Sequence, residues 1–456
     1  MEILNSKFES GVVSENTTIT PGKVHEVLSK YMLTDGFDIV LDLKNSRGIH
    51  LIDEKTGDQY IDFFAFFASS ALGMNHPKLN TSEVKEELAL AGINKPSNSD
   101  IYTTKMVEFV DTFGRFAMPD YMKHLFFISG GALAVENGLK VAFDWKVQKN
   151  FLKGYKEEKG HQVIHFKEAF HGRSGYTMSL TNTDPDKIRY FPKFNWPRII
   201  NPKISFPLEA NLESIKKLEY QAIDEIHKSI RNNPDDIAVI IIEPIQGEGG
   251  DNFFRKEFFQ KLREIADEND ILLMFDEIQT GFGLTGKFWA SEYYVNPDII
   301  SFGKKAQVCG IMVSDRIDDI PENCFRKSSR INSTWGANLV DMVRSKHILQ
   351  IIKEDNLVDN ANVQGKYLLD NLLDLQSEFK GIVSNVKGLG LMCSFDLPDQ
   401  PAINKFRKSC YQEKLLILGC GKKSIRFRPP LNITKEGLDE GLKIIKKVLS
   451  LLSSNN

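Results

Sequence analysis

Two adjacent lysines, Lys304 and Lys305, directly follow the apolar run DIISFG in the chain. A lysine at the end of a buried strand is desolvated, so it loses its proton readily and forms Schiff bases with aldehydes. The structural alternative is a pair of solvated lysines at the exit of a strand, and these two residues taken alone favour that alternative. The chemical interpretation therefore depends on which other groups reach the same place.

Carboxylates follow two other apolar runs of the same kind. Asp276 follows ILLMF, and Glu243 follows IAVIII. A carboxylate at the end of a buried strand is costly unless it meets a cation or hydrogen-bond donors. An aspartate in this position is suited to keep the nitrogen of a pyridine ring protonated. For Glu243 alone, helix capping or a structural ion pair is the favoured explanation.

A glycine turn, Gly130-Gly131-Ala132, lies between the apolar run HLFFI and the helical pattern LAVENGLKVAFDW. A helix N-terminus exposes backbone N–H groups and the positive end of the helix dipole, and both suit a phosphate group. The turn lacks G-x-G-x-x-G and is shorter than the P-loop, which argues against a nucleotide-binding α/β enzyme. A plain strand-to-helix turn is the alternative.

Aromatic and guanidinium groups occur in two further segments. Phe170, in the run FHGR, is able to stack on a pyridine ring, and Arg173 in the same run can clamp a carboxylate through two hydrogen bonds. The run IRFRPP places Arg426 and Arg428 at alternating positions of one strand, so both face the same way. Core packing for Phe170 and a surface strand for the arginines are the alternatives.

Short apolar runs alternate with helical patterns in the middle of the chain and supply the framework for these groups. The runs lack polar alternation, which is typical of strands covered on both faces in a parallel sheet. The predicted strands are 124–128, 162–166, 237–242, 271–275 and 299–302, and the predicted helices are 132–149, 212–231 and 255–268. This order predicts an α/β domain whose ligands bind beyond the carboxyl ends of the strands.

The two ends of the chain follow other patterns. Residues 50–62 are typical of a hairpin with a turn at Thr56-Gly57-Asp58. From about residue 340, helical segments (341–354, 357–378 and 434–453) surround short strands near 381–396 and 424–428. This pattern predicts a smaller α+β domain.

Composition excludes several classes of partner. The net charge is −3 and no block of Lys or Arg stands out, so neither nucleic acid nor an anionic membrane is expected as a partner. The five cysteines form no C-x-x-C pair, which is typical of reduced thiols. No metal is expected, because His161 and His165 lack the glutamate of H-E-x-x-H. With no secretory signal and no apolar run near 18 residues, we expect a cytoplasmic protein.

The motif FDEIQTGFGLTG…PDIISFGKK, together with IRFRPP, resembles the class III (ω-amino) pyridoxal-phosphate aminotransferases. The resemblance extends from about residue 22 to the C-terminus. SSALGMN, AFHGRSGYTMSLTNT, EPIQGEGGD and RINSTWG are most similar to those members that act on the side-chain amine of lysine. The resemblance implies aminotransferase fold type I, with a large α/β cofactor domain over 71–339, a small α+β domain over 340–456, and an N-terminal segment, 1–70, that packs with the small domain.

The resemblance also implies a role for each candidate residue toward pyridoxal 5′-phosphate. Lys304 would bind the cofactor covalently, with Lys305 as its rival because the usual K-x-x-x-G-G register reads KKAQVCG here. Asp276 would bind the pyridinium nitrogen. The other implied cofactor contacts are Gly131, Ala132, Phe170, Glu243, Gln279, Asn332, Ser333 and Thr334. Of these, Thr334 would reach in from the neighbouring subunit of a homodimer.

The implied reaction is a ping-pong transamination. It moves the ε-amine of L-lysine to 2-oxoglutarate and yields glutamate and 2-aminoadipate 6-semialdehyde, which cyclises to piperideine-6-carboxylate. Arg173 would hold the α-carboxylate of lysine, and Glu248 would cover Arg426 until a dicarboxylate replaces it. Ornithine or 4-aminobutyrate as donor is the nearest alternative. A catalytically idle binding protein on the same fold is the alternative from another class.

Overall fold

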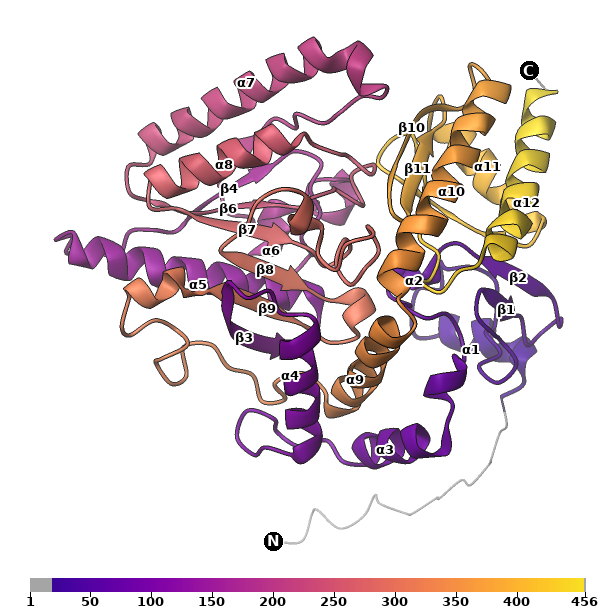
Figure 1. Cartoon of the computed structure of the whole chain (residues 1–456), viewed down its shortest axis with the longest axis horizontal. Coiled ribbons are helices and arrows are strands. Elements are labelled where there is room, and N and C mark those ends of the chain that lie inside the picture. Colours follow the sequence, from indigo (N-terminus) through magenta and orange to yellow (C-terminus); the bar gives the residue numbers. More distant parts are fainter. Residues whose placement is uncertain (1–18, 455–456) are drawn as a thin grey trace, which may run out of the picture.

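The structure, a computed structural model, describes residues 19–454 (Figure 1). Its largest sheet has seven strands in the order β3-β9-β8-β7-β6-β4-β5. Neighbours from β8 to β5 pair in parallel, whereas β9 pairs antiparallel with both β8 and β3. The strands are β3 (Met122–Ile128), β4 (Gln162–Phe166), β5 (Arg198–Ile199), β6 (Ile237–Ile242), β7 (Leu272–Asp276), β8 (Ile299–Phe302) and β9 (Cys309–Ser314).

The predicted parallel strands are confirmed. β4, β6 and β8 have the predicted bounds, while β7 begins and ends one residue later than predicted, so that Asp276 is its last residue. Strands β5 and β9 were missing from the prediction. Strand β5 has only two residues, and the glycine at position 310, near the start of β9, weakens the strand signal there.

Helices cover both faces of this sheet (Figure 1). Helix α5 (Gly131–Leu152) packs on one face, whereas α7 (Leu208–Asn232) and α8 (Lys256–Glu268) pack on the other. The sequence of strand β6 is uniformly apolar because both of its faces are buried. Val239 and Ile241 join the core under α5, and Ile240 and Ile242 join the core under α8.

A helical layer lies beside β3 and was not predicted. It consists of α3 (Ser82–Ile93), α4 (Thr104–Phe116) and α9 (Leu339–Glu354), and α9 packs on both other helices. Of the three, only α9 was predicted, as 341–354. Thr81 and Thr103 cap the N-termini of α3 and α4 by accepting a backbone hydrogen bond each.

The C-terminal part contains a four-stranded antiparallel sheet in the order β10-β11-β14-β13. The strands are β10 (Ser384–Leu389), β11 (Met392–Asp396), β13 (Leu418–Cys420) and β14 (Ser424–Phe427), and the helices are α10 (Leu357–Glu378), α11 (Gln400–Gln412) and α12 (Lys435–Ser453). The mixed helices and strands predicted after residue 340 are therefore present, and α11 is an addition.

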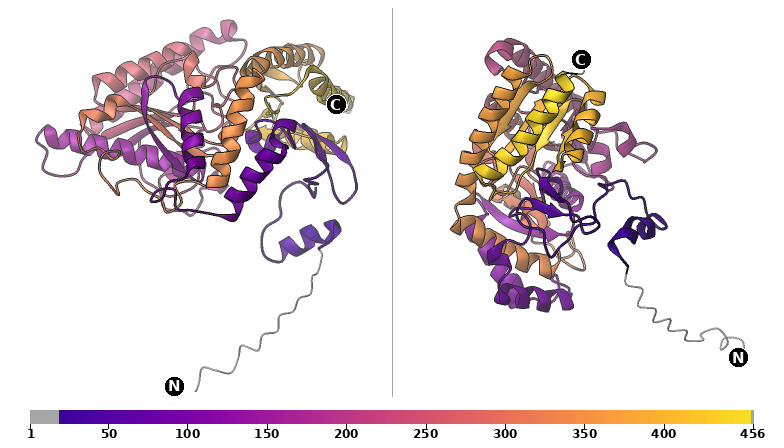
Figure 2. Two further views of the ribbon diagram at one scale, coloured as in Figure 1. Left: turned by 60° about the horizontal axis from the view of Figure 1, so that its bottom comes forward. Right: turned by 90° about the vertical axis from the view of Figure 1, so that its right-hand side faces the viewer.

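The N-terminal hairpin meets this C-terminal part. Strands β1 (His50–Ile52) and β2 (Gln59–Asp62) form the predicted hairpin, and β2 pairs in parallel with β12 (Leu415–Leu416). Figure 2 shows the hairpin next to the C-terminal helices. The domain boundaries near residues 70 and 340 stay a prediction, and the part of that N-terminal segment before residue 19 lies outside the described residues.

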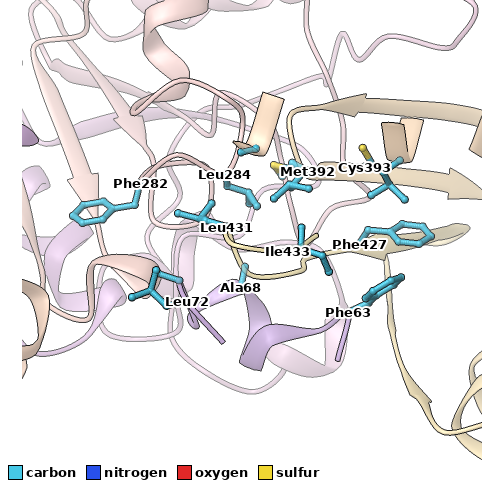
Figure 3. Packing of buried hydrophobic residues seen from close by; sticks show 14 of the residues in the cluster. Phe63, Ala68, Leu72, Phe282, Leu284, Met392, Cys393, Phe427, Leu431 and Ile433 are labelled. Carbon is cyan, nitrogen blue, oxygen red and sulfur yellow. The ribbon is translucent and has the colours of Figure 1, made fainter. Parts of the chain in front are cut away.

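One continuous core joins the large sheet, the hairpin region and the C-terminal part. Figure 3 shows side chains of this core from the hairpin region, the loop after β7 and the C-terminal part, including Phe63, Leu284 and Phe427. The rings of Phe63 and Phe427 lie 6.0 Å apart. Because native cores are close-packed, this contact fixes β14 relative to the segment that follows β2.

The remaining elements are short. They are η1 (Pro21–Lys23), α1 (Val24–Ser29), α2 (Ala65–Ala68), η2 (Pro77–Leu79), α6 (Thr177–Leu180), η3 (Pro185–Lys187), η4 (Ala290–Tyr293), η5 (Lys304–Ala306) and η6 (Asp315–Asp319). Between residues 19 and 454, none of the helices has the length and apolar character required to cross a membrane.

Candidate active site

The carboxyl ends of β4, β6, β7 and β8 open into a cavity of about 320 Å³. Ligands in doubly wound α/β folds bind at this edge of the sheet. Twelve residues line the cavity: Gly131, Ala132, Phe170, His171, Gly172, Glu243, Glu248, Asp276, Ile278, Gln279, Lys304 and Cys309. The predicted phosphate turn, aspartate and lysine therefore share one enclosed space.

Lys304 presents a free amine to this cavity. Within residues 19–454, no hydrogen bond or ion pair engages its Nζ. Burial, with the positive charges of Arg426 and Arg428, lowers the pKa of Lys304 to about 8. The backbone of Lys304 has φ 49°, a left-handed conformation that costs free energy outside glycine and occurs often at functional sites.

The neighbouring Lys305 points elsewhere. Its Nζ donates to the backbone oxygen of Ala68 at 2.8 Å, and the residue is 1% exposed. Burial holds the pKa of Lys305 well below its ordinary value. The sequence left the two lysines as rivals, and the structure places only Lys304 on the cavity wall.

Asp276 ends β7 and is nearly fully buried. Its Oδ1 accepts from the backbone N of Ile278 at 3.1 Å and from Ser301 Oγ at 3.2 Å. His171 Nδ1 lies 2.7 Å from Asp276 Oδ2, with both side chains buried. These contacts hold the carboxylate in one orientation against the cavity.

Glu243 organises the loops around the cavity. Its Oε1 accepts from the backbone N of Phe170 at 2.9 Å, and its Oε2 accepts from the backbone N of Gly247 at 3.1 Å. Burial raises the pKa of Glu243 to about 7. The side chain therefore connects the loop that carries Phe170 with the loop that carries Glu248.

The first turn of α5 forms the opposite end of the cavity. Gly130 precedes the helix with φ 106°, and among residues 19–454 no side chain caps the free N–H groups of that turn. Gly131 and Ala132 line the cavity directly. Gly172 crosses so close to this turn that a Cβ on it would lie 2.4 Å from the Ala132 Cβ, which leaves no space for a larger residue.

Three charged groups meet at the mouth of the cavity. Arg426 NH1 lies 2.8 Å from Glu248 Oε2, and Lys187 Nζ lies 2.6 Å from Glu248 Oε1. Arg426 itself is 4% exposed. The predicted Glu248–Arg426 pair is thus present, and Lys187 joins it as a second cation.

Arg428 was predicted on the same strand as Arg426, but β14 ends at Phe427, and Arg428 is buried in a different set of contacts. It forms an ion pair with the buried Asp251, and its Nε donates to Gln279 Oε1 at 2.9 Å. Arg428 therefore links β14 to the loop after β6 and to Gln279 on the cavity wall.

Arg426 meets the cavity through its ion pair with Glu248, and four other predicted residues do not line the cavity. Arg173 is exposed and lines a neighbouring cavity of about 800 Å³ with Tyr176 and Phe194. The other three, Asn332, Ser333 and Thr334, belong to the segment between β9 and α9 and do not line it either. The sequence-based role for this triplet requires a second copy of the chain.

Sequence reasoning missed His171, Lys187 and Cys309. His171 belongs to the motif FHGR and Cys309 to the motif KKAQVCG. Both could have been predicted by considering every residue of a motif that follows the end of a strand. Lys187 belongs to a loop outside any quoted motif, and only the fold brings it to Glu248.

The residues of the cavity match the chemical groups of pyridoxal 5′-phosphate. A phosphate matches the uncapped first turn of α5, and a protonated ring nitrogen matches the fixed carboxylate of Asp276. The free Nζ of Lys304 matches an aldehyde carbon, because its lowered pKa leaves part of the amine neutral at pH 7. Phe170 lines the wall where it can face a flat ring.

Comparisons with known proteins agree with this chemistry. The L-lysine-epsilon aminotransferase of Mycobacterium tuberculosis (strain H37Rv) is 48% identical over 436 residues, which cover 95% of this chain and 97% of that protein. The enzyme of the same name from Streptomyces clavuligerus is 44% identical over 453 residues, 99% of each chain. The solved structure of the M. tuberculosis lysine aminotransferase in its internal aldimine form superposes with a TM-score of 0.93 at 48% identity, covering 95% of this chain and all of that one. The family model for "Aminotransferase class-III" matches residues 32–449, and the chain therefore belongs to the class III aminotransferases, whose cofactor is pyridoxal 5′-phosphate.

Proposed function

We propose that this chain transfers the ε-amino group of L-lysine to 2-oxoglutarate, producing 2-aminoadipate 6-semialdehyde and glutamate. The observation that carries the transaminase chemistry is the unpaired Lys304 amine in one cavity with the fixed Asp276 carboxylate. The choice of lysine as donor rests on relatives at 44–48% identity over nearly the whole chain, which bear the name L-lysine-epsilon aminotransferase.

Lys304 is proposed as the group that binds the cofactor and moves the proton. When bound, pyridoxal phosphate supplies an electron sink for the C–H bond next to the transferred nitrogen. Once the amine of Lys304 is released, its Nζ would take the proton from the ε-carbon of lysine and deliver it to the cofactor. A pKa of about 8 suits this work, because the amine is able both to accept and to return a proton near neutral pH.

Asp276, Glu243 and the α5 turn are proposed to position the cofactor. Asp276 would hold the ring nitrogen protonated, and His171 would keep that carboxylate in place through its 2.7 Å contact. Glu243 lines the cavity, and its two backbone contacts support a role in holding Phe170 against the ring. Gly131 and Ala132 would donate to the phosphate, and Gln279 would meet the ring oxygen.

The Glu248–Arg426 pair is proposed to let one cavity serve two substrates. Lysine brings an uncharged methylene chain to the place where Arg426 lies, so the arginine needs another partner, and Glu248 provides it. A dicarboxylate brings its own anion to Arg426, and Glu248 then becomes replaceable. Arg173, which is exposed at the neighbouring cavity, would hold the carboxylate at the far end of either substrate.

A second copy of the chain is proposed to complete the site. Thr334 is exposed next to Trp335, whose ring lies 4.4 Å from Lys95 Nζ. Segments near Thr334 expose five apolar side chains, which we call the helical face: Leu90, Ile93, Ile101, Tyr102 and Trp335. Such a patch is typical of a protein interface. A homodimer through this face would bring Thr334 of each copy toward the other.

A panel of donors tests the proposal. Purified holoenzyme is given L-lysine, L-ornithine or 4-aminobutyrate with 2-oxoglutarate, and glutamate and the cyclised semialdehyde are measured by mass spectrometry. We expect lysine to give the highest kcat/KM. A higher kcat/KM with ornithine or 4-aminobutyrate would reject the donor and leave the transaminase chemistry in place.

A catalytically idle binding protein on this fold is the rival from another class. Borohydride reduction of the purified protein distinguishes the two, because it fixes the cofactor on the lysine that binds it. We expect peptide mapping to find the modification on Lys304. A colourless protein without that modification would support the rival. The cytoplasmic location expected from the sequence stays a prediction.

A further inference from the structure

Glu248 lies between two cations instead of facing Arg426 alone. Its Oε2 lies 2.8 Å from Arg426, and its Oε1 lies 2.6 Å from Lys187. The side chains of Lys187 and Glu248 are about one quarter exposed (26% and 27%), whereas Arg426 is buried. Throughout residues 19–454, no further cation pairs with Glu248. The carboxylate thus has one buried partner, Arg426, and one partner toward solvent, Lys187.

The backbone of Glu248 is held on both sides. Its carbonyl oxygen accepts from the N of Gly421 at 2.8 Å, and Gly247 N donates to Glu243. Gly249 is so close to the neighbouring loop that a Cβ would lie 2.1 Å from the Glu168 carbonyl oxygen. A movement of Glu248 away from Arg426 is therefore a rotation of its side chain, and the partners within its reach are those already in contact.

Lys187 is placed by its own loop. It ends the turn η3, whose N-cap Asp184 accepts from the backbone N of Asp186 at 3.0 Å. Its Nζ also lies 5.3 Å from the centre of the Phe170 ring, which is a favourable cation–π distance. Lys187 thus has an anchor that does not depend on Glu248, and its ammonium stays near the cavity when Glu248 rotates.

The charges favour a transfer of Glu248 from one cation to the other. While Glu248 covers Arg426, its negative charge is shared between two positive groups. Once a substrate carboxylate binds Arg426, the charge of Glu248 repels that carboxylate and needs another partner. Lys187 then has both oxygens of Glu248 available to its three donors, so its attraction for Glu248 is greater in that state.

We propose that Lys187 is a specificity-determining residue that receives Glu248 when a dicarboxylate substrate binds Arg426. The inference rests on the proposed function, in which 2-oxoglutarate follows lysine into the same cavity. Lys187 therefore favours the acceptor half of the reaction and has little effect on the donor half, since Glu248 can cover Arg426 without it.

Three variants of the holoenzyme test this role. Lys187→Met removes the ammonium, Lys187→Arg retains a cation, and Lys187→Gln provides a second neutral replacement in case the methionine disturbs the loop. The matched control is Arg189→Met, which removes a positive charge from the same loop; Arg189 pairs with Asp186 at the surface and does not contact Glu248. Absorbance of the bound cofactor and circular dichroism show that each variant is folded and loaded.

Two measurements are compared with wild type. Steady-state ping-pong kinetics give separate KM values for lysine and 2-oxoglutarate. Calorimetric titration with glutarate, an unreactive dicarboxylate, gives binding without turnover. For Lys187→Met and Lys187→Gln we expect the KM for 2-oxoglutarate and the Kd for glutarate to rise about three- to fivefold, the upper end of the scale for one partly exposed ion pair. The KM for lysine should change by less than about twofold, and Lys187→Arg and Arg189→Met should resemble wild type.

The opposite pattern overturns the proposal. A rise in the KM for lysine with unchanged glutarate binding would mean that Lys187 locks Glu248 onto Arg426. Equal changes in both KM values, or the same changes in Arg189→Met, would mean a general effect of charge or loop structure. Each KM and Kd is compared with the wild-type value, and the glutarate titration does not depend on which donor the enzyme uses. A wild-type protein that fails to use lysine therefore counts against the donor assignment and not against Lys187.

Discussion

Lys304 and Lys305 have the same side chain and adjacent positions, yet their amines have different surroundings. Lys304 Nζ faces the cavity and has no partner in the described part of the chain, whereas Lys305 Nζ donates to the carbonyl oxygen of Ala68. The difference follows from the turn η5, which sends successive side chains in different directions. The position of each lysine in the turn, and not its residue type, therefore decides whether its amine is available for chemistry or serves a structural hydrogen bond.

Replacing each lysine should separate these roles. For Lys304→Ala we expect no borohydride-fixed cofactor and turnover lower by at least about 10²- to 10⁴-fold, the range for losing a positioned acid–base group. For Lys305→Met we expect retained cofactor and a loss of about 1–3 kcal/mol in stability, because the Ala68 carbonyl is left buried without its donor. Peptide mapping and urea unfolding measure the two effects. A covalent cofactor on Lys305 in wild type would reverse the assignment.

The pH dependence of cofactor capture follows from the lowered pKa of Lys304. Only the neutral amine attacks an aldehyde, so the rate at which apoprotein captures pyridoxal phosphate should rise about tenfold per pH unit and level off above a midpoint near 8. Stopped-flow absorbance at a series of pH values measures this rate. Arg426→Gln removes one of the cations that lower the pKa, so its midpoint should move upward. A wild-type midpoint near the ordinary 10.5 would contradict the argument.

At the scale of elements, the site depends on how β14 meets the loop after β6. Gly421 N donates to the Glu248 carbonyl, and Ser424 Oγ donates to the Gly250 carbonyl at 3.0 Å. Arg428, the first residue after β14, forms a buried ion pair with Asp251. These contacts place Arg426 opposite Glu248 and keep it there.

The buried pair between Arg428 and Asp251 should be important for stability. Both side chains are almost completely buried, at 2% and 0% exposure. Asp251→Asn leaves the guanidinium without its counter-charge, and we expect a loss of about 3–5 kcal/mol in the free energy of unfolding, measured in urea. Asp370→Asn, which breaks the exposed Lys366–Asp370 pair on α10, is the control and should cost under about 1 kcal/mol. Similar losses in both variants would show that the buried pair adds nothing specific.

At the scale of the whole molecule, the chain leaves parts of its proposed site exposed. Thr334 lies on the surface beside the helical face, which α3, the segment between α3 and α4, and the segment before α9 form together. Because such apolar exposure is unfavourable in water, a second copy that covers it would both stabilise the fold and complete the cofactor site.

Charges on the helical face should separate the copies. We expect Leu90→Glu combined with Ile93→Glu to shift the protein from dimer to monomer in analytical ultracentrifugation and to weaken cofactor retention, since Thr334 no longer reaches a neighbour. Val363→Glu is the control, because Val363 is equally an exposed apolar residue (65%) but lies on α10. A wild-type protein that is monomeric and retains its cofactor would refute the shared site.

Much of the framework could be predicted from the sequence, and for a local reason. Runs such as IAVIII are buried on both faces, so their composition alone marks them as central parallel strands, and the residues that end them must gather at one edge. Asp276, Lys304 and the Gly131 turn were found in this way. Strand β9 and the helices α3 and α4 were missed because their short or mixed sequences depend on neighbours for their burial.

Only the tertiary structure decided which groups touch. It separated Lys304 from Lys305 through a turn of three residues, brought His171 onto Asp276 across 105 positions, and placed Lys187 against Glu248. It also left Arg173 and Thr334 outside the cavity that one chain forms. Residue type and burial are properties of a short segment and can be read along the chain. Contacts between side chains depend on how separate segments pack, and no single segment contains that information.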